Sequence, residues 1–214
     1  MSETKKRIFA SVIMLLILAL VVMLEFFEIN ATRYLGIAIV LMMIYEFGRN
    51  IMQITRQNLS QNWGKYSFFA ILLLLMLLSI NAVGQKPWIV LLMLLTICAA
   101  DIGAWLFGRM IGGDKMWQNI SENKTWAGQI AGILCGTFAS VLYGLLGTDA
   151  FLPQLLWIGI SVSLLSQYGD LTASYIKRKI GIKDFGTILP GHGGILDRFD
   201  GWIYVLPIIW LVML

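Results

Sequence analysis

Long runs of apolar residues are the feature that most restricts the fold of this sequence. A transmembrane helix needs about 20 consecutive apolar residues, and by that length the chain divides into about seven segments. We place them near residues 8–27, 32–48, 66–84, 88–107, 127–147, 153–174 and 197–214. Only 13% of the residues are charged, whereas soluble domains have about a quarter. The sequence therefore predicts an all-α polytopic integral membrane protein.

The positive charges fall mostly on one side of these segments. If the N-terminus is cytoplasmic, the cytoplasmic segments are 49–65, 109–126 and 175–196, and only Arg33 and Lys86 of the 16 Lys and Arg lie near the outer face. Cytoplasmic loops of membrane proteins are enriched in Lys and Arg. We therefore expect the N-terminus and these three segments to lie in the cytoplasm and the C-terminus to lie outside. Topology then accounts for the net charge of +4, and no nucleic-acid partner is expected.

The expected helices divide into two groups. We expect residues 1–86 to form N-terminal membrane helices and residues 87–214 to form a second membrane half, with cytoplasmic loops at 109–126 and 175–196.

A stripe of small residues marks the expected helix at 127–147. Its members recur at every fourth position: Gly128, Gly132, Gly136, Ser140 and Gly144. Small residues let helix backbones approach closely in lipid. The stripe predicts close helix packing, either inside the chain or between two copies.

Two aspartates lie inside expected membrane helices. Asp101 is about 20 Å along the helix at 88–107, and Asp170 is about 25 Å along the helix at 153–174. An ionisable residue within a span is unfavourable by several kcal/mol and usually marks a site or a pathway. The alternative is a carboxylate that is merely paired with a neighbouring cation.

The last apolar run is too short to cross a membrane. Residues 201–214 form about 21 Å of helix, against a hydrocarbon slab of about 30 Å. We therefore expect this helix to begin near Asp197, so that Asp197 and Asp200 share a helical face at the cytoplasmic edge. Paired carboxylates near phosphates favour Mg²⁺, which usually binds one or two carboxylates together with water and substrate phosphates.

The polar stretch KRKIGIKDFGTILPGHGGILDRFD, residues 177–200, lies between the last two expected helices. Its glycine-rich part, residues 190–194, lets the backbone approach a ligand just before a helix N-terminus, where free amides attract anions. Lys177, Arg178 and Lys183 add positive charge. The combination predicts a bound polyanion, a nucleoside triphosphate, held with magnesium and carboxylates at the membrane surface.

The same stretch resembles the signature of the phosphatidate cytidylyltransferases, also called CDP-diacylglycerol synthases. The matching residues are Ser174, Lys177-Arg178, Lys183-Asp184, Gly186, Pro190, His192-Gly193-Gly194 and Asp197-Arg198-Phe199-Asp200. Segments around Asp101 and Asp170 are similar to further landmarks of the family. The resemblance covers about residues 96–214.

The resemblance implies that the protein is a magnesium-dependent nucleotidyltransferase of phospholipid biosynthesis. CTP and phosphatidate would give CDP-diacylglycerol and pyrophosphate in a bacterial inner membrane, in contact with membrane lipid, and the protein would form a homodimer. The phosphate monoester of the lipid has a second pKa of about 6, so His192 is expected to orient a substrate rather than act as a base.

The resemblance also implies roles for individual residues. The expected catalytic residues are Asp170, Lys177, Asp197 and Arg198. The expected metal ligands are Asp170, Asp197 and Asp200. The expected substrate-binding residues are Asp101, Lys124, Ser174, Arg178, Lys183, His192, Gly193 and Gly194.

One loop departs from the family pattern. Where the family typically has Ser-Pro-Lys-Lys-Thr and then Trp-Glu-Gly, this chain has SENKT at 121–125 and WAG at 126–128. One lysine and one glutamate are absent, although Lys124 can still bind a phosphate. Two other classes stay open: a transporter, and a non-catalytic membrane protein of the same fold. Binding of CTP with and without magnesium would separate the enzyme from both.

Overall fold

The computed structural model describes residues 16, 19–21, 23–25, 29–118, 120–121, 123–147, 151–189 and 193–213. This part of the chain is mostly helical, and its only β pairing consists of isolated bridges. The helices are α2 (Ala31–Gln53), α3 (Arg56–Val83), α4 (Pro87–Ile111), α5 (Trp126–Gly147), α6 (Leu152–Ile180), α7 (Leu196–Phe199) and α8 (Trp202–Met213). The all-α prediction is confirmed.

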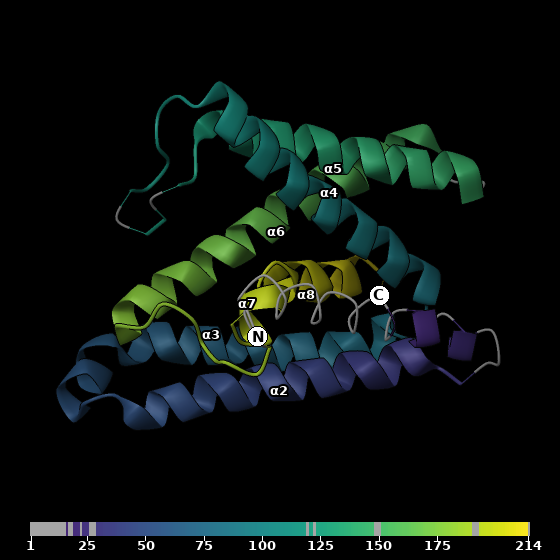
Figure 1. Cartoon of the computed structure of the whole chain (residues 1–214). Coiled ribbons are helices and arrows are strands. Elements are labelled where there is room, and N and C mark those ends of the chain that lie inside the picture. The colour runs from purple at the N-terminus through teal and green to yellow at the C-terminus, as the bar shows by residue number, and fades with distance from the viewer. Residues whose placement is uncertain are drawn as a thin grey trace. The chain divides into compact units, whose positions relative to one another are not determined.

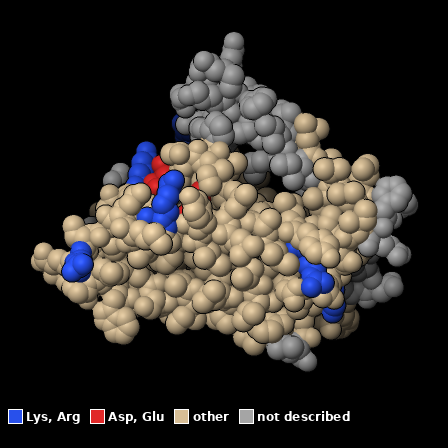
Figure 2. All heavy atoms as spheres, turned by 90° about the horizontal axis from the view of Figure 1, so that it is seen from below, with Lys and Arg blue, Asp and Glu red and all other residues tan. Residues whose placement is uncertain are grey.

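Among the described helices, four are long and apolar enough to cross a membrane: α2, α3, α4 and residues Trp126–Leu146 of α5. On the face shown in Figure 2, most of the surface carries neither acidic nor basic side chains, and the charged ones gather in small groups. Such a surface suits contact with lipid. The prediction of a polytopic membrane protein is confirmed, while the number of spans stays a prediction.

Several helices extend beyond their expected ends. α3 begins at Arg56 instead of residue 66, and α6 continues to Ile180 instead of ending at residue 174. Residues 175–180, expected in a loop, are therefore helical. Hydropathy detects only the apolar part of a helix, whereas Lys and Arg are good helix formers. Cations in the last turn also interact favourably with the helix dipole.

The expected single helix at 197–214 is wrong. The structure has the four-residue α7, a turn at Asp200 and Gly201, and then α8 of 12 residues. Glycine is a poor helix former, and it stands where the helix is interrupted. α8 is about 18 Å long, which is less than the thickness of a membrane.

The chain forms two compact units, and α6 contributes to both. The first unit consists of Met1–Pro87 with Tyr175–Leu214, and the second is Trp88–Ser174. In the first unit, α2 and α3 lie side by side (Figure 1), and α3 also packs against α8. The division at residue 86 into N-terminal and catalytic halves stays a prediction.

The second unit is built on the stripe of small residues on α5. A Cβ added to Gly132 would lie 2.8 Å from the carbonyl oxygen of Ala100 on α4, so the two backbones are nearly in contact. Ser140 Oγ donates a hydrogen bond to the Leu155 carbonyl of α6, at 3.0 Å. The stripe therefore faces α4 and α6, and the predicted close packing occurs inside the chain.

Candidate functional site

Phe185 anchors the loop between α6 and α7. Its buried ring packs against Phe47 of α2 and Phe69 of α3, with ring centroids 6.5 and 6.1 Å away. Its carbonyl oxygen accepts a hydrogen bond from Asn50 Nδ2 at 2.6 Å. Aromatic packing and one buried hydrogen bond thus fix the middle of the loop on α2 and α3.

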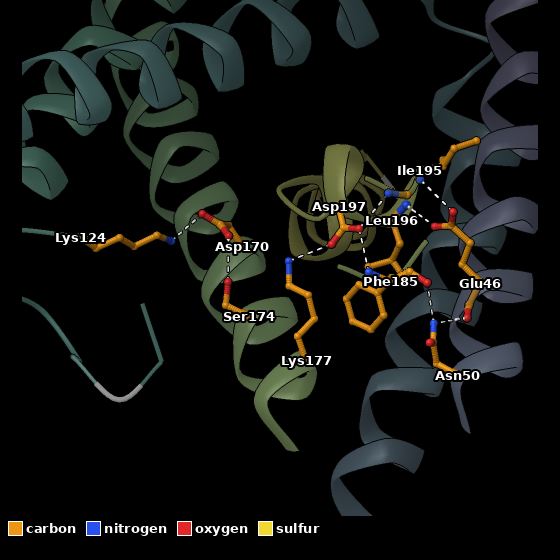
Figure 3. A network of polar contacts seen from close by, with 11 residues as sticks. Glu46, Asn50, Lys124, Asp170, Ser174, Lys177, Phe185, Ile195, Leu196 and Asp197 are labelled. Atoms are coloured by element: carbon orange, nitrogen blue, oxygen red, sulfur yellow. Dashed lines mark hydrogen bonds and ion pairs between the residues drawn. The ribbon is translucent and has the colours of Figure 1, made fainter. Parts of the chain in front are cut away.

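Asp197 closes the loop (Figure 3). Its Oδ2 accepts hydrogen bonds from the backbone amides of Phe185 and Gly194, at 2.8 and 2.9 Å. Its Oδ1 lies 2.9 Å from Nζ of Lys177, and only 4% of the Asp197 side chain is exposed. The middle of the loop, its C-terminal end and α6 therefore meet on one carboxylate.

Glu46 of α2 holds the other side of the same segment. The residue is buried, and its Oε1 and Oε2 accept hydrogen bonds from the amides of Ile195 and Leu196, at 3.1 and 2.9 Å. These amides lie at the start of α7, where helix amides have no partner within the helix. Glu46 thus links α2 to the start of α7, although Ile195 and Leu196 are 149 and 150 residues away in the sequence.

A polar pocket of about 570 Å³ opens beside this loop, within the first unit. Its charged lining residues are three cations, Arg49, Lys183 and Arg198, and one acid, Asp184. The volume falls in the range of small-molecule sites, about 300–1,000 Å³. Three cations against one carboxylate make the pocket suitable for an anion such as a polyphosphate.

The second unit carries its own charged cluster. Lys124 Nζ lies 2.6 Å from Oδ2 of Asp170, and Ser174 Oγ donates to Oδ1 of Asp170 at 3.3 Å. Asp101 of α4 interacts electrostatically with Asp170 and Lys124. The structure therefore brings Lys124 and Ser174 into contact with the carboxylate of Asp170 on α6, with the charge of Asp101 nearby.

Thr125 explains why Lys124 is held at this place. Its Oγ1 accepts a hydrogen bond from the amide of Gly128 at 3.1 Å, so Thr125 caps the N-terminus of α5. The carbonyl of Lys124 itself accepts from the amide of Met116 at 2.8 Å. These hydrogen bonds thus fix the backbone at Lys124, although the loop departs from the family pattern.

The structure places the other predicted residues in different settings. Gly193 accepts a hydrogen bond from the amide of Leu189, at 2.9 Å. Arg178 is exposed on α6, and Asp200 is the C-cap residue of α7. His192 lies outside the described residues. The roles expected for these residues stay predictions.

Sequence reasoning missed Glu46, Arg49 and Asn50 of α2, as well as Phe185. One signal was present, because Glu46 is the single acidic residue between positions 31 and 53. An ionisable residue in an apolar span suggests a site, as it did for Asp101 and Asp170. The roles of Asn50 and Phe185 depend on contacts that only the fold creates.

The carboxylates suit the Mg²⁺ that the resemblance implies. No group of three His, Cys, Asp or Glu side chains in the described ranges could hold a metal ion, but Mg²⁺ needs only one or two carboxylates.

A carboxylate has about four lone-pair positions. Asp197 uses three of them for Lys177, Phe185 and Gly194. Asp170 uses two for Lys124 and Ser174, so each aspartate retains an oxygen lone pair for a hard cation.

The fold and these contacts define a helical membrane protein with a cationic pocket and lysine-paired aspartates. A family model described as the cytidylyltransferase family matches residues 1–214, so the chain belongs to this family. The chain is 42% identical over 126 residues to the phosphatidate cytidylyltransferase of Staphylococcus saprophyticus subsp. saprophyticus, covering 58% of this chain and 48% of that relative.

A second relative gives a similar match. The chain is 43% identical over 122 residues to the phosphatidate cytidylyltransferase of Staphylococcus aureus (strain COL), covering 56% of this chain and 46% of that relative. The chain thus spans about half the length of the curated relatives it matches.

Proposed function

We propose that the chain transfers the cytidylyl group of CTP to phosphatidate, giving CDP-diacylglycerol and pyrophosphate. The observation that carries this proposal is the pocket beside the loop of Asp197, where Arg49, Lys183 and Arg198 gather. Membership of the cytidylyltransferase family and the activity named for the Staphylococcus relatives support the same reaction.

The chemistry requires positioning more than proton transfer. A phosphate oxygen of phosphatidate attacks the α-phosphorus of CTP, a new P–O bond forms, and the bond to the β-phosphate oxygen breaks, releasing pyrophosphate. The attacking phosphate is largely ionised at neutral pH, since its second pKa is about 6. No general base is therefore needed, and His192 is proposed to orient a substrate.

The basic residues of the first unit stabilise the phosphates. In phosphoryl-type transfer, most catalysis comes from alignment and from stabilising negative charge. Arg49, Lys183 and Arg198 are proposed to bind the β- and γ-phosphates, which leave as pyrophosphate. Lys177, whose side chain is 12% exposed, holds Asp197 in place and adds positive charge next to the loop.

We assign magnesium dependence to the same reaction. Asp197, Asp170 and Asp200 are the proposed metal ligands, and each of the first two is supported by the surroundings within its own unit. When bound, Mg²⁺ shields the phosphate charge and activates the phosphorus toward attack. Lys124 and Ser174 are proposed to orient Asp170, while Asp101 and Arg178 are proposed substrate contacts.

The location and assembly of the enzyme are further parts of the proposal. We expect the bacterial inner membrane, a cytoplasmic site where CTP is present, and a homodimer. The small-residue stripe of α5 contacts α4 and α6, so a homodimer would use another surface.

The direct test is an assay of product formation. The purified full chain in mixed micelles would receive phosphatidate and CTP, with magnesium or with EDTA, and lipids would be identified by mass spectrometry. We expect CDP-diacylglycerol and an equal amount of pyrophosphate only with magnesium. Binding of CTP without product would instead indicate a non-catalytic family member and would refute the proposed activity.

A further inference from the structure

Two side chains of α2 reach the loop that carries Asp197. Glu46 and Asn50 are four residues apart and therefore lie on one face of the helix. Asn50 Nδ2 donates to the carbonyl of Phe185 at 2.6 Å and to the carbonyl of Glu46 at 2.7 Å. Glu46 accepts from the amides of Ile195 and Leu196. One helical face thus holds the middle of the loop and the start of α7 (Figure 3).

Because Glu46 and Asn50 are buried, their polar groups must keep these hydrogen bonds. Glu46 is 1% exposed and Asn50 is 6% exposed. A buried polar group is strongly unfavourable unless hydrogen bonds satisfy it. Both Glu46 oxygens find backbone amides, so the segment that supplies those amides has one favourable position relative to α2.

Glycines leave the space that the Glu46 carboxylate occupies. A Cβ built on Gly194 would lie 2.5 Å from Glu46 Oε2, and a Cβ on Gly186 would overlap with Glu46 Oε1. Both glycines therefore act as a socket for this side chain.

We infer that Glu46 and Asn50 are positioning residues, through which α2 sets the place of Asp197 and of the cationic pocket. The inference rests on the proposed function for its catalytic consequence. Its structural content is independent, because the chain of contacts runs from Glu46 through Ile195 and Leu196 to α7, and from Asn50 through Phe185 to Asp197.

The first test replaces Glu46 by Gln, which keeps the size of the side chain. One Gln oxygen can still accept an amide, but its NH₂ group faces the second amide. Because a misplacement of about 1 Å can lower a rate about 100-fold, we expect kcat to fall by about that factor. Hydrogen exchange at the Ile195 and Leu196 amides should become about tenfold faster. Ser79→Ala, a buried change on α3 that removes only a bond to the Met76 carbonyl, should alter neither.

A mutant cycle tests the socket. Gly186→Ala should reduce kcat strongly in the wild-type background, because the new methyl group meets the Glu46 carboxylate. In a Glu46→Ala background, the factor by which Gly186→Ala lowers kcat should be at least ten times smaller. The reason is that the effects of mutations at neighbouring residues that share space are not additive.

The outcomes separate the two proposals. Product formation by the wild type, with unchanged kcat and unchanged exchange in Glu46→Gln, would overturn the inference and leave the function intact. No product from the wild type, with faster exchange in Glu46→Gln, would overturn the function and leave the positioning role intact. Additive effects of Gly186→Ala and Glu46→Ala would overturn the socket.

Discussion

Replacing Asp197 by Asn is the sharpest test of the site, because the change removes a charge and keeps the size. Asn can present one oxygen to the amides of Phe185 and Gly194, which now donate to Asp197 at 2.8 and 2.9 Å. Its NH₂ group must then face the ammonium of Lys177, which is 2.9 Å from the carboxylate. The variant therefore leaves a largely buried cation opposite a hydrogen-bond donor.

The exposed fractions of the two lysine pairs set the expected magnitudes. The side chains of Lys177 and Asp197 are 12% and 4% exposed, and removing one partner of such a largely buried pair lowers the free energy of unfolding by up to about 3–5 kcal/mol. Those of Lys124 and Asp170 are 25% and 39% exposed. Solvent screens that pair, so Asp170→Asn should lower the free energy of unfolding by only about 0–1 kcal/mol.

Both variants should nevertheless lose cytidylyl transfer, and added magnesium should restore little, because a proposed ligand is gone. The measurements are unfolding by SDS titration in mixed micelles and CDP-diacylglycerol formation. A double variant with Lys177→Met and Asp197→Asn should regain stability without regaining activity, since replacing a whole buried pair is often neutral. Equal small losses of stability in Asp197→Asn and Asp170→Asn would refute the reasoning from burial. Near wild-type turnover of both would refute the metal assignment.

Four further expectations concern other parts of the chain. Arg49→Ala should raise the KM for CTP by about 10- to 150-fold, as the loss of one charged phosphate contact of about 1.5–3 kcal/mol predicts, whereas Lys86→Ala should leave kinetics unchanged; equal KM values would remove Arg49 from the site. Thr125→Ala should lower the free energy of unfolding by about 1 kcal/mol, because the α5 cap is lost, and an unchanged SDS midpoint would argue against that cap. A cysteine at the exposed Thr187 should react only with membrane-permeant reagents in intact cells, so labelling by an impermeant reagent would reverse the proposed orientation. His192→Gln should keep appreciable turnover and an unchanged pH profile, and inactivity of a folded variant that binds CTP would show that the histidine has a larger role.

Apolar run length was enough to predict the class of fold. Helices must satisfy their backbone hydrogen bonds internally in lipid, so sequence alone predicts helices wherever such runs occur. The ends of the helices were harder to predict from the sequence. α6 continues through Lys177 and Arg178, where the chain becomes polar but the helix propensity stays high.

The surroundings of Asp197 could be predicted only where the residues are close in sequence. Lys177, Gly194 and Asp197 belong to one stretch, and the structure brings them together. Glu46 and Asn50 act on that stretch from 135 to 150 positions away. Local patterns contain no information about such pairs, because only the packing of Phe185 against α2 and α3 creates them.

The socket formed by Gly186 and Gly194 has a consequence for how related sequences can diverge. Any residue larger than glycine at either position meets the carboxylate at position 46. A relative that shortens residue 46 frees the space at position 186 and also removes the acceptor for two amides at the start of α7. A Cβ at position 194 would still lie 2.7 Å from the backbone nitrogen of Gly186. Positions 46 and 186 are thus expected to change together during evolution, whereas position 194 stays glycine, so that a covariation signal would join the apolar N-terminal half of the chain to the polar motif near its end.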